Sequence, residues 1–98
     1  MIIPMTKRGP IEIDPEQWPV VAESRDARHG ASLTVRRHAD GRHLVYGTAL
    51  NDAGDGHWHA GMLAPVDLAS AIVLVSSHLL GSRELLADCL GQLPPERV

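Results

Sequence analysis

The segment 33–47 constrains the fold most, because Asp40-Gly41 lies in its middle between two strand-forming runs. Both central residues of a type I′ turn need a positive φ, which Gly adopts freely and Asp tolerates. We therefore expect a β-hairpin with a two-residue loop. This loop fixes the register and places His38 opposite His43.

This register sorts the hairpin side chains into two faces. The apolar face, expected to point to the core, consists of Leu33, Val35, Leu44 and Tyr46. The polar and partly basic face consists of Thr34, Arg36, His38, His43 and Val45. We expect any function of the sheet on this polar face or at the hairpin tip, and a loop longer than two residues would overturn the assignment.

The length of 98 residues predicts a single domain, residues 1–98. Hydrophobic residues make up 44% and charged residues 21%, which indicates a folded chain. The sequence has no Phe, two Trp and one Tyr, so the core must be built from aliphatic side chains. A small aliphatic core is marginal, which favours a homodimer.

The formal charge of −3 argues against nucleic acid as the main partner, since backbone binding needs a basic excess. A single Cys excludes an intrachain disulfide. Met1–Met5 is too short for a signal peptide core, so a reducing cytoplasm is expected. The longest apolar run, around 71–75, is far shorter than a membrane span.

The N-terminal third contains few periodic segments. Residues 1–10 are expected to form a flexible N-terminal arm, with 11–13 able to add a short edge strand. Asp14, Pro15 and Gln17 are typical of a helix start, and Pro19 limits this helix to about one turn. Residues 20–24 are a candidate strand.

A third strand is expected at 57–63. Its residues alternate, with Trp58, Ala60 and Met62 on one side and His57, His59 and Gly61 on the other. Matching the core faces places Thr48 opposite Trp58. The segments then form an antiparallel meander of three strands, or four if 20–24 joins.

Two helices are predicted after the strands. Pro65 and Asp67 open the first, which ends at Gly81. Its main apolar stripe is Leu68, Ala71, Ile72, Val75 and Leu79. Ser82 caps the second helix, Pro94-Pro95 ends it, and its apolar face is Leu85, Leu86, Cys89, Leu90 and Leu93. We therefore predict an α+β fold in which two C-terminal α-helices pack on one face of the 3–4-stranded meander.

The first helix has a second apolar stripe, formed by Ala69, Val73 and Leu80. A helix that is apolar on two sides is expected to lie between two partners. The sheet is one partner, and the other is the second helix or a second copy of the chain. These three residues are therefore the candidate oligomer interface.

Metal binding is a weak alternative. His57 and His59 share a strand face and can reach one ion, but a site needs further ligands. His43 lies roughly 13 Å from them in the expected register. Asp52 and Asp55 can complete such a site, but two solvated histidines on a polar face are the simpler interpretation. No cofactor is expected.

The sequence also argues against an enzyme. Cys89 lies on an apolar helix face, where a thiol acts as a small inert hydrophobic group. The helix serines are not part of a nucleophile elbow. The Gly-rich segment 51–56 has no following Lys and Ser or Thr, so it is not a phosphate loop.

The strongest surface feature is a basic cluster on the expected hairpin. It consists of Arg36, Arg37, His38, Arg42 and His43, without an expected internal acidic partner. Its charge is then available to bind carboxylates or phosphates. The alternative is a solvated hairpin whose charges prevent aggregation at a sheet edge. Trp18 and Tyr46 are able to stack on bases, but the place of Tyr46 on the core face disfavours an RNA-binding sheet.

The stretch from Val35 to Gly47, preceded by the stretch from Glu12 to Val20, resembles small uncharacterised accessory proteins of proteobacterial plasmids and phages. The resemblance covers about half of the chain and carries no catalytic motif. It implies cargo of a mobile element, a class that includes non-enzymatic inhibitors of host defence such as anti-CRISPR proteins. The expected function is therefore binding of a macromolecular partner, first of all a protein. The alternatives are an anti-CRISPR-like inhibitor, a His-based metal-binding protein and a nucleic-acid-binding regulator.

Overall fold

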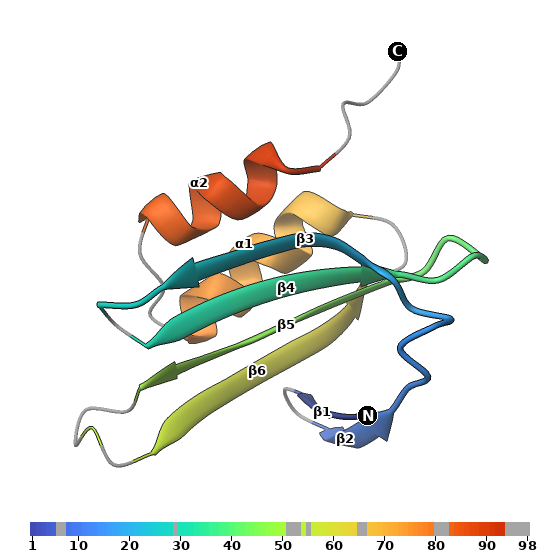
Figure 1. The fold of residues 1–98 in the computed structure, drawn as a ribbon, viewed down its shortest axis with the longest axis horizontal. Coiled ribbons are helices and arrows are strands. Elements are labelled where there is room, and N and C mark those ends of the chain that lie inside the picture. The colour runs from blue at the N-terminus through green and yellow to red at the C-terminus, as the bar shows by residue number, and fades with distance from the viewer. Residues whose placement is uncertain are drawn as a thin grey trace.

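A four-stranded antiparallel sheet in the order β3-β4-β5-β6 forms the centre of the computed structural model (Figure 1). The structure describes residues 1–5, 8–28, 30–50, 54, 56–64, 67–79 and 83–93. The sheet strands are β3 (Val20–Asp26), β4 (Ala31–Arg37), β5 (His43–Leu50) and β6 (His57–Ala64). The helices are α1 (Leu68–His78) and α2 (Arg83–Gly91), and β1 (Ile2–Met5) with β2 (Arg8–Glu12) forms a separate hairpin. The predicted α+β class is confirmed, with the meander in its four-stranded form.

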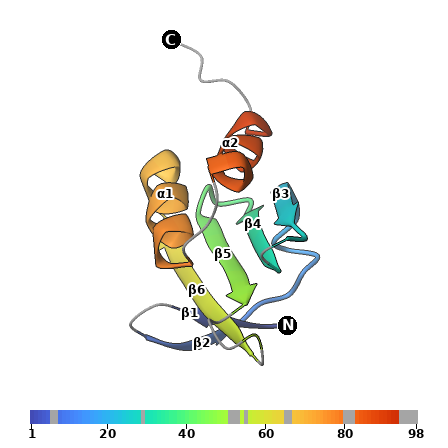
Figure 2. The ribbon, with the colours of Figure 1, turned by 90° about the vertical axis from the view of Figure 1, so that its left-hand side faces the viewer.

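Both helices cover the same face of the sheet, here called the helix face (Figure 2). α1 packs on β5 and β6, and α2 packs on β3 and β4. The predicted main stripe of α1 is confirmed, because Ala71, Ile72, Val75 and Leu79 are buried. Leu85 and Cys89 of α2 are buried in the same core, and Leu86, Leu90 and Leu93 pack against it.

Asp67 caps α1 as expected, and its side chain accepts a hydrogen bond from Ser70 N. The predicted end of α1 at Gly81, the cap at Ser82 and the stop at Pro94-Pro95 lie outside the described residues.

The N-terminal hairpin β1–β2 replaces the expected arm. Ile2 pairs with Glu12 and Ile3 with Ile11 in an antiparallel ladder. The hairpin packs on the opposite side of the sheet, here called the outer face, so that the sheet carries a second apolar core. This second core consists of Ile3, Met5, Ile13, Trp18 and Leu44. Because both faces are packed, the sheet is buried on two sides over part of its area.

The loop between β4 and β5 corrects the predicted register. His38 N donates a hydrogen bond to Arg42 O, so the loop has three residues instead of two. Only Gly41 takes a positive φ, 95°, as in a type I turn followed by a left-handed residue. His43 is therefore paired with Arg37, and Val45 with Val35.

This one-residue shift moves every β5 side chain to the other face. Leu44 and Tyr46, predicted in the helix-face core, lie on the outer face. Val45, predicted on the polar face, is buried under the helices. The predicted alternation of β6 holds, but Trp58 pairs with Ala49 instead of Thr48.

The remaining expectations concern short segments. The turn after Asp14 forms as predicted, since Asp14 O accepts hydrogen bonds from Gln17 N and Trp18 N. In the described part of the chain, no helix has the length and hydropathy needed to cross a membrane. The predicted dimer stripe includes Ala69 and Val73, which are exposed on α1, while Leu80 lies outside the described residues. Self-association stays a prediction.

Candidate functional site

The outer face of the sheet is divided into a covered and an open part. The hairpin β1–β2 lies close to β5 and β6, where the absence of a side chain at Gly61 makes room for it. A Cβ at Gly61 would lie 2.5 Å from Pro4 O and 3.0 Å from Met5 Sδ. The rest of the outer face, on β3, β4 and the second half of β5, remains open. A groove of about 660 Å³ lies there.

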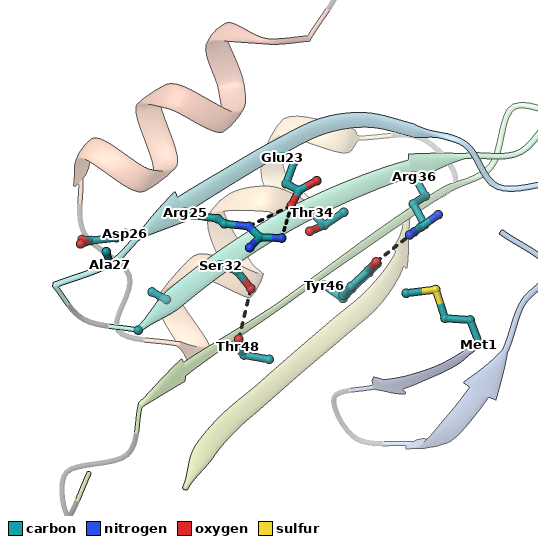
Figure 3. Close-up of a pocket in the computed structure, with 12 residues that line it drawn as sticks. Met1, Glu23, Arg25, Asp26, Ala27, Ser32, Thr34, Arg36, Tyr46 and Thr48 are labelled. Carbon is teal, nitrogen blue, oxygen red and sulfur yellow. Dashed lines mark hydrogen bonds and ion pairs between the residues drawn. The ribbon is translucent and has the colours of Figure 1, made fainter. Parts of the chain in front are cut away.

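The floor of this outer groove is lined by hydroxyl groups (Figure 3). They belong to Ser32, Thr34, Tyr46 and Thr48. Ser32 Oγ and Thr48 Oγ1 lie 3.1 Å apart and share a hydrogen bond across the strands. These residues come together because alternate residues of β4 and β5 share a face. The floor can therefore donate and accept hydrogen bonds without a strong charge of its own.

An ion pair on β3 forms one rim of the groove. Arg25 donates from Nε at 3.0 Å and from Nη2 at 2.8 Å to the same oxygen of Glu23. The side chain of Arg25 is 78% exposed, so this pair contributes little to stability. Met1 of the N-terminal hairpin lines the groove on another side.

Arg36 lies at the other end of the outer groove. Its Nε donates to Tyr46 Oη and its Nη1 to Trp18 O, both at 2.9 Å. Both acceptors are neutral, and no carboxylate in the described part of the chain pairs with this half-buried guanidinium. Two hydrogen bonds therefore hold an uncompensated positive charge in a fixed orientation at the end of a polar groove.

The hairpin tip has an internal acid, contrary to the expectation. Asp40 Oδ2 accepts a hydrogen bond from Arg42 Nε at 2.7 Å, and Asp40 Oδ1 lies 3.1 Å from His38 Nδ1. A hydrogen bond from the Arg42 backbone N–H lowers the pKa of Asp40, and the Arg42 side chain adds to this effect. The ring of the buried Trp18 packs against the His38 ring, with 4.9 Å between the two ring centroids. The guanidinium carbon of Arg42 lies 5.2 Å from the centroid of the Trp18 ring. The charged side chains at the hairpin tip are thus largely paired or packed within the chain.

The predicted partner-binding cluster is accordingly split between three places. Arg36 lies in the outer groove, and His38 and Arg42 pack on Trp18. Arg37 and His43 are cross-strand neighbours on the helix face, two residues along from the buried pair of Val35 and Val45. Sequence reasoning correctly placed Thr34 and Arg36 on a polar face, but missed the groove residues of β3 and β5. The alternating polar residues of β4, Ser32, Thr34 and Arg36, were the available signal for this floor.

His43 gives the protein a testable pH dependence. Burial lowers its pKa below the ordinary value of 6.5, and the positive charge of Arg37 lowers it further. Below about pH 7 the unfolded chain then binds more protons than the folded chain, so stability falls as the pH drops toward the folded pKa. We expect His43→Gln to flatten this slope between pH 7 and 5, measured as urea midpoints. The matched control His57→Gln, at an exposed histidine, should keep the slope, and an unchanged slope in His43→Gln would refute the assignment.

The other chemical candidates are weaker. His57 and His59 share a face as predicted, with ring centroids 6.5 Å apart. Among the described residues, no group of three His, Cys, Asp or Glu side chains is placed to hold a metal ion. Asp52 and Asp55, the suggested further ligands, lie outside this part of the chain. Burial raises the pKa of Cys89 to about 11, with a smaller effect of Asp88, as for an unreactive core thiol.

Comparisons with known proteins add no relative. No known protein family, no curated protein and no solved structure matches this chain. The argument for a function therefore depends on the geometry of the outer groove.

Proposed function

We propose that the chain is a small non-enzymatic protein that binds a protein partner through the outer groove. The observation that carries the proposal is Arg36, an oriented and uncompensated cation at the end of a hydroxyl-lined groove. Burying part of a charge without a carboxylate partner costs free energy, and an incoming carboxylate offsets this cost. The groove is thus suited to a partner segment with an acidic side chain at one end.

The shape and charge of the groove favour an extended peptide segment. The floor follows β4 from Ser32 to Arg36, which corresponds to roughly 13 Å along a strand. The charged residues that line the groove are mixed, Glu23 and Asp26 beside Arg25 and Arg36, so the groove offers no continuous basic track for the repeated phosphates of a nucleic acid. The net charge of −3 also disfavours a nucleic acid as the partner. The proposal includes a function as mobile-element cargo, for example as an anti-CRISPR-like inhibitor.

The proposal is tested by capture experiments from nuclease-treated lysate with substitutions in the groove. Thr48→Tyr fills the floor, and Arg25→Glu reverses the charge of an exposed rim residue. The matched controls Ser77→Tyr and Arg83→Glu make the same kind of change at exposed positions on α1 and α2. We expect both groove variants to retain less than about one fifth of the captured partner, and both controls to retain it fully.

Folding of every variant is checked by circular dichroism, so that loss of capture is not loss of structure. Equal capture by the groove variants and the wild type would refute the proposal. A partner that is captured only from lysate without nuclease treatment would indicate a nucleic-acid-mediated contact, and would also contradict the proposal.

A further inference from the structure

A second groove lies along β6, on the side of the sheet away from β5. This edge groove of about 340 Å³ is placed between the N-terminal hairpin and α1. Figure 2 shows α1 and the hairpin on either side of this outermost strand. The residues that matter for its chemistry are Met5, Arg8, Met62, Leu63, Leu74 and His78. None of them belongs to the outer groove.

The walls of the edge groove are apolar and adaptable. Leu74 of α1 is 49% exposed, although it is a large aliphatic side chain. Met62 and Met5, two of the three methionines of the chain, line the same groove, Met62 half-buried and Met5 only 9% exposed as part of the second core. Methionine is flexible and polarisable, and is common on surfaces that adapt to hydrophobic anchors. The volume is sufficient for one or two side chains of a partner.

The polar side chains that line the edge groove are an arginine and a histidine. Arg8 and His78 line it, and among the described residues no carboxylate does. Within the described part of the chain, Arg8 forms no ion pair. An acidic protein that keeps a basic residue beside an apolar groove provides charge complementarity for an acidic ligand.

We infer that the edge groove binds a short segment of a partner protein in which aliphatic residues are flanked by carboxylates. The aliphatic side chains pack between Leu74 and the two methionines, and the carboxylates contact Arg8 and His78. A second copy of the chain is disfavoured, because a two-fold contact centred here would bring the Arg8 side chains of both copies close together. This inference is independent of the outer groove and of its partner.

The three methionine methyl groups allow a direct test. In protein labelled with ¹³C at these methyl groups, Met5 and Met62 report on the edge groove, and Met1 reports on the outer groove. The probe is a capped hexapeptide with two leucines flanked on each side by two glutamates. We expect it to shift the NMR signals of Met5 and Met62 and to leave that of Met1 unchanged.

Two control peptides separate the contributions of charge and apolar contact. Lysine in place of glutamate, and serine in place of leucine, should each weaken binding roughly fivefold or more. Arg8→Glu should weaken binding of the acidic peptide to a similar degree, and Leu74→Ser should do the same. The control Arg83→Glu, at an exposed position on α2, should bind it like the wild type.

Several outcomes would overturn the inference. These are no shift of Met5 and Met62 at millimolar peptide, a shift of Met1 alone, or unchanged binding in Arg8→Glu. Shifts of Met5 and Met62 that depend on protein concentration without peptide would show that a second copy occupies the groove. A failure of the outer-groove capture experiment leaves this test unaffected, because the two grooves share no residue.

Discussion

Gly47→Ala is expected to lower the free energy of unfolding by about 3 kcal/mol, at the upper end of overpacking effects. The Cβ added at this position of β5 would overlap with the backbone carbonyl oxygen of Ser32 and lie 2.8 Å from Leu79 Cδ1. Ser32 belongs to the neighbouring strand β4, so its carbonyl cannot move without distorting the ladder. Leu79 is buried against the sheet, so its side chain cannot move out of the way into solvent.

Urea denaturation followed by circular dichroism measures this effect. Gly91→Ala is the matched control, since a Cβ at Gly91 meets nothing within 4 Å. Gly91 lies in the last turn of α2, where alanine is expected to be neutral or to stabilise by up to about 1 kcal/mol. Equal urea midpoints for the two variants would contradict the close packing of α1 on β5.

The turn type marks the limit of what the sequence predicts about this fold. Asp40-Gly41 is compatible with a two-residue loop and with a three-residue loop in which Gly41 alone has a positive φ. The structure selects the second loop, in which Asp40 accepts hydrogen bonds from the backbone and the side chain of Arg42. Sequence alone does not rank these local interactions, and the choice shifts the register by one residue.

The hydrophobic pattern of β5 is compatible with both registers, because both faces of this strand are apolar. Leu44 and Tyr46 point to the second core, while Val45 and Ala49 point to the helices. A period of two identifies the buried face only when the other face is polar. The main stripe of α1, the apolar face of α2 and the alternation of β6 were predicted correctly, since in each the residues that face the core form one continuous apolar row.

The N-terminal hairpin was missed because its second strand lacks strand-forming composition. β2 contains Gly9 and Pro10, and most of its residues are exposed. The hairpin covers part of the outer face, and the edge of this covered part is the boundary of the outer groove. The candidate site was therefore predictable only in its β4 part, where Thr34 and Arg36 depend on no other strand. Tyr46, Thr48 and Met1 reach the groove through the register and through contacts distant in sequence.

Trp18 links the second core, the hairpin tip and the outer groove. Its side chain is only 7% exposed and belongs to the cluster with Ile3 and Leu44. His38 and Arg42 pack on its ring, and its carbonyl oxygen accepts a hydrogen bond from Arg36. Loss of this side chain should therefore affect both the stability of the protein and the geometry of the proposed site.

Trp18→Ala is accordingly expected to lower the free energy of unfolding by about 3–5 kcal/mol, through lost burial and the cavity left behind. Trp58→Ala is the matched control, because Trp58 is 50% exposed and should cost about 1 kcal/mol or less. Urea midpoints compare the two variants, and limited proteolysis reports whether Trp18→Ala also releases the hairpin β1–β2 from the outer face. Trp18→Phe keeps an aromatic ring and should recover part of the stability. If both alanine variants unfold at the same urea concentration, the second core does not hold the N-terminal hairpin on the sheet, and the boundary of the outer groove must be drawn elsewhere.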